Sequence, residues 1–337
     1  MKITVYHKKE YTGTGLYRLH FPHELMARWG HQVKFTDSIN IADYDCDILV
    51  VSKAQFVPVM DIVKALRKRG VVTIIDFDDY WNLTYGHLLH GHYREHNTSY
   101  TLVDALKEFD HVTCTTEILQ REILQYHKSV QVFENAIDED DPQFKRANIP
   151  SQRVRFGWIG GHCHLPDIKL LDGTPRKLTG DFSIHLFGHD GIAGGVYDDF
   201  AKILSGDNYL TFQGKFLISN LAPIKLYTQY YNQIDVALVP LVMNKFNSMK
   251  SELKIVEAGF MHKAAIVSDV DPYSLLLTDK NCLRVNVKPH WKKRMQRLIN
   301  NPSQIEDLGE ALYETVKDKF DLHRVTKRRE QWYKSII

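Results

Sequence analysis

The chain has 337 residues, with 43 Lys and Arg against 41 Asp and Glu, and a formal net charge of +2. This length suits two domains of about 150 residues, each with its own core. The near-neutral balance gives no strong electrostatic footprint for nucleic acid or for an anionic bilayer.

The sequence carries no pattern for export or for membrane insertion. It has no run of about 18 consecutive apolar residues, and a strand-like run begins at Met1, so we expect neither a transmembrane helix nor a signal peptide. Cys46, Cys114, Cys163 and Cys282 are scattered without a Cys-x-x-Cys pair. Such spacing favours reduced thiols over a disulfide framework, and we therefore expect a cytoplasmic protein.

Apolar, strand-like runs alternate with helical patterns in the first half of the chain. Strands are predicted at 2–7, 32–36, 46–51, 71–76, 111–115 and 130–133, and helices at about 15–29, 58–69, 99–109 and 116–127. This alternation predicts a parallel sheet covered by helices on both faces. The segment 138–150 is charged, contains two prolines and lacks periodicity, so we place a linker there.

The alternation resumes after the linker. Strands are predicted at 153–159, 182–187, 209–213, 235–240, 264–268 and 282–287, and helices at about 218–231, 249–260, 288–299 and 303–318. A basic amphipathic helix is predicted at about 321–335. We therefore predict an α/β protein with Rossmann-like domains at 1–148 and 149–318, followed by a helical segment at 319–337.

Gly13-Thr14-Gly15 follows the first predicted strand and opens a helix. In an open α/β sheet, phosphate or sugar groups bind at this carboxyl edge of the strands. Glycines there let backbone N–H groups come close to a ligand, although a tight turn requires glycines equally. The loop is therefore a candidate ligand site.

Asp76-Phe-Asp78-Asp79 closes the fourth predicted strand. Carboxylates crowded in this way repel one another, so they require a metal ion, sugar hydroxyls or an Arg partner unless the turn is simply solvated. We expect these carboxylates to contact a sugar or an acceptor rather than a metal ion.

The segment after these acids is crowded with histidines: His87, His90, His92 and His96. With Asp79 they could supply metal ligands, but their spacing matches no familiar metal site. The alternative that we favour is a loop rich in Tyr and His whose side chains form hydrogen bonds with an acceptor substrate. His162 and His164 pose the same question, and we expect no bound metal ion.

The helix predicted after the strand at 235–240 carries phosphate-binding chemistry at its start. Asn247 and Ser248 are favourable N-caps, and Lys250 and Lys254 lie one turn apart on the same stripe. A nucleoside diphosphate fits this end, because free backbone N–H groups, the positive end of the helix dipole and two ammonium groups attract its phosphates.

Glu257 lies on the same stripe, deeper in the predicted helix. Its carboxylate could accept hydrogen bonds from both hydroxyls of a ribose. The alternative is a surface helix in which Lys254 and Glu257 form an ion pair that contributes roughly a few tenths of a kcal/mol.

The order and spacing of several motifs extend these observations over nearly the whole chain. They are Phe133-Glu-Asn-Ala-Ile-Asp138, Phe156-Gly-Trp-Ile-Gly-Gly161, and the stretches 235–241, 246–259 and 263–269. The first resembles the interdomain Pro-Asn-Gly-Ile-Asp segment of family 4 glycosyltransferases, the second the strand and glycine turn that open their second domain, and the rest their donor-binding segment.

The resemblance implies the GT-B fold, with two Rossmann-like domains whose sheets face a central cleft and a last helix that crosses back to the first domain. It assigns donor binding to Gly15, Gly160, Gly161, His164, Lys250, Ser251 and Glu257. It also implies that the first domain binds the acceptor, and we expect the binding residues to be Tyr17, Arg18, Asp79 and His87.

The chain also departs from the family pattern. Met249 stands eight residues before Glu257, where family members often have a Glu. Gly161-His162 stands where they often have an Arg, and Asp78 where many have a His beside the donor sugar.

We predict transfer of a sugar from a UDP or GDP sugar to an acceptor hydroxyl. The resemblance implies retention, with the leaving phosphate taking the acceptor proton, and we expect Lys250, Lys254 and Asp78 to be catalytic without a cofactor or a metal ion. A glycan or lipid-linked saccharide is the default acceptor, with a small molecule or a modified nucleic-acid base as the alternative. A nucleotide-sugar epimerase, a glycan phosphorylase or a non-catalytic nucleotide-sugar-binding module is the alternative function.

Overall fold

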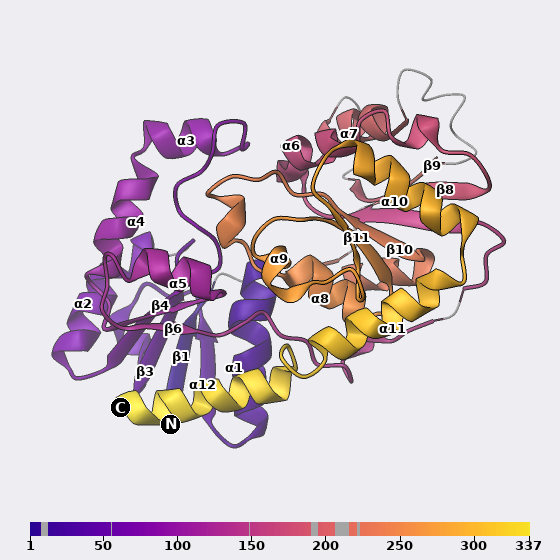
Figure 1. Ribbon diagram of the computed structural model, residues 1–337. Helices are drawn as coiled ribbons and strands as arrows, with labels where there is room; N and C mark the ends of the chain where they lie inside the picture. The colour runs from indigo at the N-terminus through magenta and orange to yellow at the C-terminus, as the bar shows by residue number, and fades with distance from the viewer. Residues whose placement is uncertain (8–12, 55, 148, 190–194, 206–215, 221–222) are drawn as a thin grey trace.

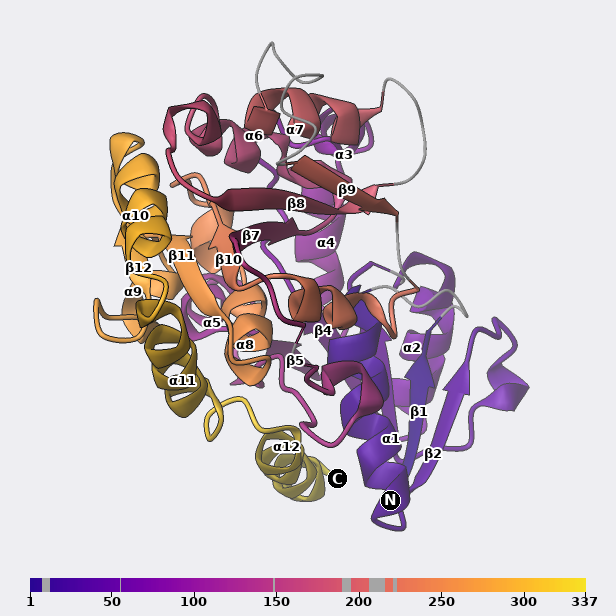
Figure 2. The same ribbon diagram turned by 90° about the vertical axis from the view of Figure 1, so that its right-hand side faces the viewer.

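The computed structural model describes residues 1–7, 13–54, 56–147, 149–189, 195–205, 216–220 and 223–337 (Figure 1). These residues form two α/β domains side by side, each with a six-stranded parallel sheet (Figures 1 and 2). The predicted α/β architecture with two parallel sheets is confirmed. The domain boundaries after residues 148 and 318 stay predictions.

The first sheet has the strand order β2-β1-β3-β4-β5-β6. Its strands are β1 (Lys2–Tyr6), β2 (Gln32–Thr36), β3 (Ile48–Ser52), β4 (Val72–Phe77), β5 (His111–Cys114) and β6 (Val130–Val132). The helices of this domain are α1 (Phe21–Arg28), α2 (Met60–Lys68), α3 (His90–Glu95), α4 (Thr98–Leu106) and α5 (Glu117–Ile123). Every residue of β3 is buried, which is typical of a strand covered on both faces.

The second sheet has the order β12-β11-β10-β7-β8-β9. Its strands are β7 (Val154–Ile159), β8 (Phe182–His189), β9 (Phe216–Asn220), β10 (Val236–Val239), β11 (Ala264–Ser268) and β12 (Leu283–Val285). Its helices are α6 (Leu165–Ile168), α7 (Val196–Ser205), α8 (Leu253–Phe260), α9 (Tyr273–Leu276), α10 (Pro289–Asn300) and α11 (Gln304–Val316). No helix among the described residues has both the length and the apolar character required to cross a bilayer.

The segment around β9 differs from the prediction. The strand predicted at 209–213 lies outside the described residues. The prediction of a helix at 218–231 is wrong, because β9 pairs with β8 as far as Asn220 and a 3₁₀ helix occupies Tyr227–Gln233. Pro223 lies between them, and proline disrupts a helix interior.

The last helix, α12 (Leu322–Ile336), returns to the first domain and packs against α1 (Figures 1 and 2). Tyr333 is fully buried there, in an apolar cluster that includes Leu19 and Met26. Its hydroxyl oxygen lies 3.0 Å from Nε2 of the buried His23. The C-terminal helix is therefore part of the core of the domain in which the chain begins.

We predict that Tyr333→Ala lowers the free energy of unfolding by about 3–5 kcal/mol, the range for removing a buried aromatic side chain. Urea unfolding followed by circular dichroism measures this change. Arg324→Ala is the matched control on the same helix, because its exposed ion pair with Asp318 contributes at most about 1 kcal/mol. An unchanged unfolding midpoint for Tyr333→Ala would contradict the docking of α12.

Candidate functional site

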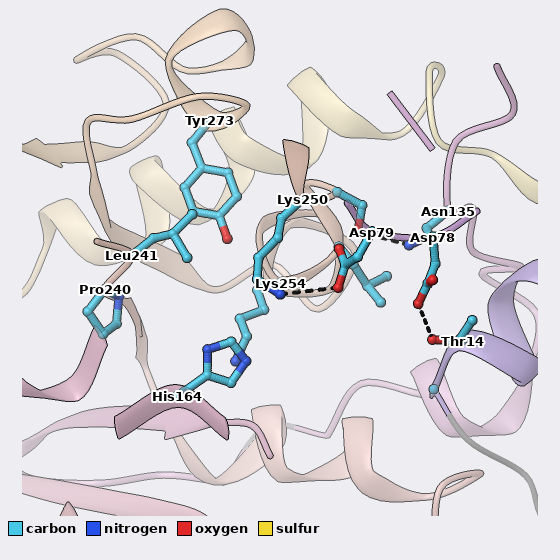
Figure 3. Close-up of a pocket in the computed structure, with 13 residues that line it drawn as sticks. Thr14, Asp78, Asp79, Asn135, His164, Pro240, Leu241, Lys250, Lys254 and Tyr273 are labelled. Atoms are coloured by element: carbon cyan, nitrogen blue, oxygen red, sulfur yellow. Dashed lines mark hydrogen bonds and ion pairs between the residues drawn. The ribbon is translucent and has the colours of Figure 1, made fainter. Parts of the chain in front are cut away.

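A cavity of about 190 Å³ lies between the two domains (Figure 3). It is formed by segments that follow β1 and β4 in the first domain, and by segments that follow β10 and open α8 in the second. Its lining residues are Gly13, Thr14, Asp78, Asp79, Asn135, His164, Pro240, Leu241, Lys250, Ser251, Leu253, Lys254 and Tyr273. The carboxyl ends of both sheets thus contribute to one cavity, at the place where open α/β sheets bind ligands.

The helix predicted to open near Asn247 begins later, so the predicted N-caps are wrong. Asn247–Met249 is a single 3₁₀ turn, Lys250 is extended, and α8 starts at Leu253. Asn247 lies six residues before Leu253, too far from α8 to cap it, and its side-chain amide donates to the backbone oxygen of Val242, 2.8 Å away. Leu253 and Lys254, the first two residues of α8, line the cavity, and the first amides of a helix have no partner within it.

Lys250 reaches toward the first domain (Figure 3). Its Nζ lies 3.2 Å from Oδ2 of Asp79 and 4.7 Å from the centre of the Phe246 ring. Burial disfavours the ammonium form, but Asp79 outweighs burial and raises the pKa of Lys250 above its ordinary value. Lys250 is therefore a fixed positive charge in the cavity.

Lys254 lies four residues further along the chain, in the first turn of α8, so Lys250 and Lys254 do not share the predicted helical stripe. Its Nζ donates to the backbone oxygen of Ile159 at 2.7 Å and lies 4.8 Å from the centre of the Trp158 ring. Burial lowers the pKa of Lys254 to about 8, so the ammonium form still predominates at pH 7. A Cβ at residue 160 would lie 2.4 Å from this Nζ and 2.7 Å from the Trp158 ring, so a larger residue there would displace both side chains.

His164 lines the same cavity and is held by Asp167, with its Nδ1 2.8 Å from Oδ2. Burial, together with the charge of Lys254, lowers the pKa of His164 to about 4, so the ring is neutral at pH 7. A neutral ring that donates a hydrogen bond from Nδ1–H to Asp167 keeps an acceptor at Nε2. His164 is thus better suited to a sugar hydroxyl than to a phosphate oxygen.

A smaller cavity of about 100 Å³ adjoins the first and shares His164 and Lys250 with it. His87 lines this second cavity, with its ring 5.3 Å from the ring of Phe246. Burial, and then the charge of Lys250, lower the pKa of His87. Within the described part of the chain, no group of three or more His, Cys, Asp or Glu has the arrangement of a metal site.

Asp78 is buried on the first-domain side of the larger cavity. Its Oδ2 accepts a hydrogen bond from the Thr14 hydroxyl at 2.5 Å, and its Oδ1 lies 2.9 Å from Nζ of Lys53. Burial opposes ionisation, but Lys53 and Thr14 outweigh it and hold the pKa of Asp78 well below its ordinary value. This geometry suits a residue that positions the Thr14 loop, and the catalytic role of Asp78 stays a prediction.

Glu257 is a buried carboxylate, with 2% of the residue exposed. It accepts hydrogen bonds from the hydroxyls of Tyr17 (2.8 Å), Tyr231 (3.1 Å) and Tyr227. Burial raises the pKa of Glu257 to about 8, and the hydrogen bond from Tyr17 opposes this rise only in part. Because Tyr17 belongs to the first domain, Glu257 links the two domains.

A scan against protein-family models and a search of curated proteins give no match for this chain. Several solved structures of other proteins are similar to its fold. Sucrose-phosphate synthase from Thermosynechococcus elongatus is 13% identical with a TM-score of 0.79, over 99% of this chain and 98% of that one. Anabaena HepE in complex with UDP-glucose is 13% identical with a TM-score of 0.68, over 99% and 100%. An alpha-glucosyltransferase in complex with UDP and a 13-mer DNA containing a HMU base is 12% identical with a TM-score of 0.66, over 99% of both chains. This chain has the GT-B fold.

The GT-B cleft brings many of the predicted site residues together. The larger cavity is lined by Asp78, Asp79, His164, Lys250, Ser251 and Lys254, and the adjoining one by His87. Among the described residues, the other predicted ones line neither cavity: Gly15, Tyr17, Arg18, Gly160, Gly161 and Glu257.

Arg18 and Gly15 have internal partners that sequence analysis did not find. Arg18 is fully buried, and its Nη2 and Nε lie 2.8 and 3.0 Å from the carboxylate oxygens of Asp76. A Cβ at residue 15 would lie 2.2 Å from Nε2 of His7, so Gly15 permits close packing there. The structure thus places Arg18 inside the first domain, where it neutralises Asp76 instead of facing an acceptor.

Three polar lining residues were not predicted to be at the site. Asn135 donates from Nδ2 to the Ser251 hydroxyl, 2.9 Å away across the cleft, and its place in the interdomain motif was a usable signal. Thr14 lies within the glycine loop that was singled out, whereas Tyr273 follows β11 without any local pattern that points to a ligand.

We predict that Glu257→Gln flattens the pH dependence of stability. Because the pKa of Glu257 is about 8 in the folded protein and the reference value is 4.5, the folded state binds more protons between these limits, and stability falls as pH rises through this window. The loss is at most about 1.4 kcal/mol per pH unit, and Glu257→Gln removes it.

Urea unfolding at pH 5, 6.5 and 8 measures this effect. Glu314→Gln is the matched control, since Glu314 is exposed on α11. If wild type and Glu257→Gln lose stability in parallel between pH 5 and pH 8, Glu257 does not take up its proton on folding.

Proposed function

We propose that the protein is a glycosyltransferase that moves a sugar from a UDP or GDP sugar to an acceptor hydroxyl. The observation that carries this proposal is the cavity in which the start of α8, Lys250 and Lys254 face the Thr14 loop of the other domain. Helix-start amides and two ammonium groups at one place suit a diphosphate. HepE, which has a similar fold, has been solved with UDP and with UDP-glucose, and this supports the proposal.

In the proposed reaction, cleavage of the bond between the sugar and the diphosphate moves negative charge onto the leaving group. Asp79 and the Phe246 ring hold Lys250 in place beforehand, so its charge requires little reorganisation during the reaction. In the retaining scheme the leaving phosphate takes the acceptor proton, and the new bond forms on the face from which the phosphate departs. We propose that no protein base, cofactor or metal ion takes part.

Glu257 is proposed to read the ribose of the donor. Its carboxyl oxygen Oε1 already accepts hydrogen bonds from the hydroxyls of Tyr17 and Tyr227, and two ribose hydroxyls offer the same kind of donor. Since Tyr17 belongs to the first domain, exchange of its hydroxyl for a ribose hydroxyl would loosen one contact between the domains. Donor binding is therefore proposed to include a movement of the domains relative to each other.

The acceptor is proposed to be a glycan or a lipid-linked saccharide that enters from the first-domain side, near Asp79 and His87. The alternative is a modified nucleic-acid base, since one protein of similar fold was solved with DNA. The net charge of +2 favours the saccharide. We place the enzyme in the cytoplasm, because its four cysteines are free thiols, as is usual in a reducing compartment.

Calorimetry with a panel of UDP and GDP sugars, followed by mass analysis of the products, tests the proposal. We expect one donor to bind and to release its nucleoside diphosphate slowly in water, at a rate that an excess of EDTA leaves unchanged. A donor that binds but stays intact would indicate a binding module, and a donor that changes its sugar without acceptor would indicate an epimerase. Activity abolished by EDTA and restored by Mn²⁺ would contradict metal independence.

We predict that Lys250→Ala lowers turnover by roughly 10²–10³, the scale for removing one preorganised group that stabilises developing charge. Steady-state kinetics with the identified donor measures the change. Lys202→Ala, which removes an exposed lysine from α7, is the matched control and should leave turnover unchanged. A higher KM with wild-type turnover would instead make Lys250 a ground-state anchor for the donor.

A further inference from the structure

The loop between β4 and α3 lines cavities in addition to the one proposed for the donor. Asp78 and Asp79 line the donor cavity, and His87 lines the adjoining one. Between them, residues 80–83 line a separate cavity of about 350 Å³ that belongs entirely to the first domain. This cavity lies between the loop and helices α3 and α4, which stand above the first sheet at the upper left of Figure 1.

Aromatic rings form much of the wall of this first-domain cavity. Tyr80, Trp81, Tyr93, Tyr100 and Tyr126 all line it. Trp81 is almost fully buried, and its ring centre lies 4.8 Å from that of Tyr80 and 5.7 Å from that of Tyr126. Tyr100 and Tyr126 are 75% and 42% exposed, so they present apolar ring surface to solvent at the cavity mouth. Exposed rings beside a buried aromatic wall are typical of a binding surface.

Polar side chains are placed among these rings. Asn82, Asn97 and Arg94 line the cavity, and the Ser99 hydroxyl, which also lines it, donates to the backbone oxygen of Trp81 at 2.9 Å. That hydrogen bond ties α4 to the loop, so the cavity has a fixed wall. Its volume falls within the range of about 300–1,000 Å³ for small-molecule sites.

This combination favours a carbohydrate over the other ligands that stack on aromatic rings. A sugar ring presents an apolar C–H face to an aromatic ring and hydroxyls at its edge to amide and guanidinium groups. A nucleic acid would also require several cations along its phosphates, whereas Arg94 is the single Lys or Arg among the described lining residues.

We propose that this first-domain cavity is a glycan subsite, which binds the part of an oligosaccharide acceptor that lies away from the reacting hydroxyl. The inference rests on the proposed function and narrows its acceptor to a glycan chain of several sugar rings. Asp79 lines the donor cavity and Asn82 lines the first-domain cavity. These residues are three peptide units apart, so their Cα atoms lie within about 11 Å of each other. A short oligosaccharide covers that distance.

A printed glycan array, probed without any donor, tests the subsite. We expect wild type to bind a set of related oligosaccharides, and titration of a bound glycan to change the fluorescence of Trp81 in the cavity wall. Tyr100→Ala combined with Tyr126→Ala should weaken that binding by at least roughly tenfold, since two stacking surfaces are lost. Leu88→Ala is the matched control, because Leu88 is exposed on the loop between β4 and α3 but does not line the cavity.

The outcomes separate the subsite from the proposed function. A wild-type protein that cleaves a nucleotide sugar but binds no glycan on the array would overturn the subsite alone. Tyrosine-dependent glycan binding by a protein that neither binds nor cleaves any nucleotide sugar would support the subsite and overturn the transferase proposal. Tyrosine-dependent binding of a single-stranded DNA oligonucleotide, with no glycan bound, would overturn the subsite in favour of a nucleic-acid surface.

Discussion

The carboxyl group of Glu257 joins the two domains through hydrogen bonds from tyrosine hydroxyls. It is buried and accepts hydrogen bonds from Tyr17 in the first domain and from Tyr227 and Tyr231 in the second. A buried carboxyl group without hydrogen-bond partners is costly, so it constrains where the hydroxyls of both domains lie. A ribose and Tyr17 present the same donor group to the same acceptor. In the proposed enzyme, recognition of a nucleotide and the position of the domains would therefore be coupled through one side chain.

The two lysines of the cavity differ in charge behaviour because they have different neighbours. Asp79 keeps Lys250 in its charged form, since the raised pKa lies well above neutral pH. Lys254 has a backbone oxygen and the Trp158 ring for partners, and burial lowers its pKa to about 8. The positive charge that would face a diphosphate is thus close to two at pH 7 and falls toward one above pH 8.

Sequence patterns predicted the strands other than β9, and the place of the cavity, because both follow from features that are local in the chain. Apolar runs mark the strands, and the ends of parallel strands share one edge, so Lys250 and Lys254 were predictable from the run before them. The partner of Arg18 was not predictable, because Asp76 is 58 residues away in sequence and only the folded sheet brings the two together. A similar reason explains the wrong cap: Asn247 is a favourable N-cap by local pattern, but in the fold it belongs to a separate 3₁₀ turn, and α8 begins only at Leu253. Local sequence preference predicts which side chains could bind a ligand or cap a helix. It does not predict which of them the tertiary fold uses for internal contacts.

Met249, which departs from the family pattern, has a clear role in the interface. It is buried with Phe246 in an apolar cluster whose other members, including Phe77 and Trp81, come from the first domain. A glutamate at this position would place a carboxylate in that cluster without a partner, at a high cost in free energy. Met249 therefore stabilises contact between the domains and offers no hydrogen bond to a donor sugar. In the proposed enzyme, recognition of the donor sugar would come from other groups that line the cavities beside Lys250. One of them is the neutral His164, whose Nε2 is an acceptor with the chemistry to bind a sugar hydroxyl.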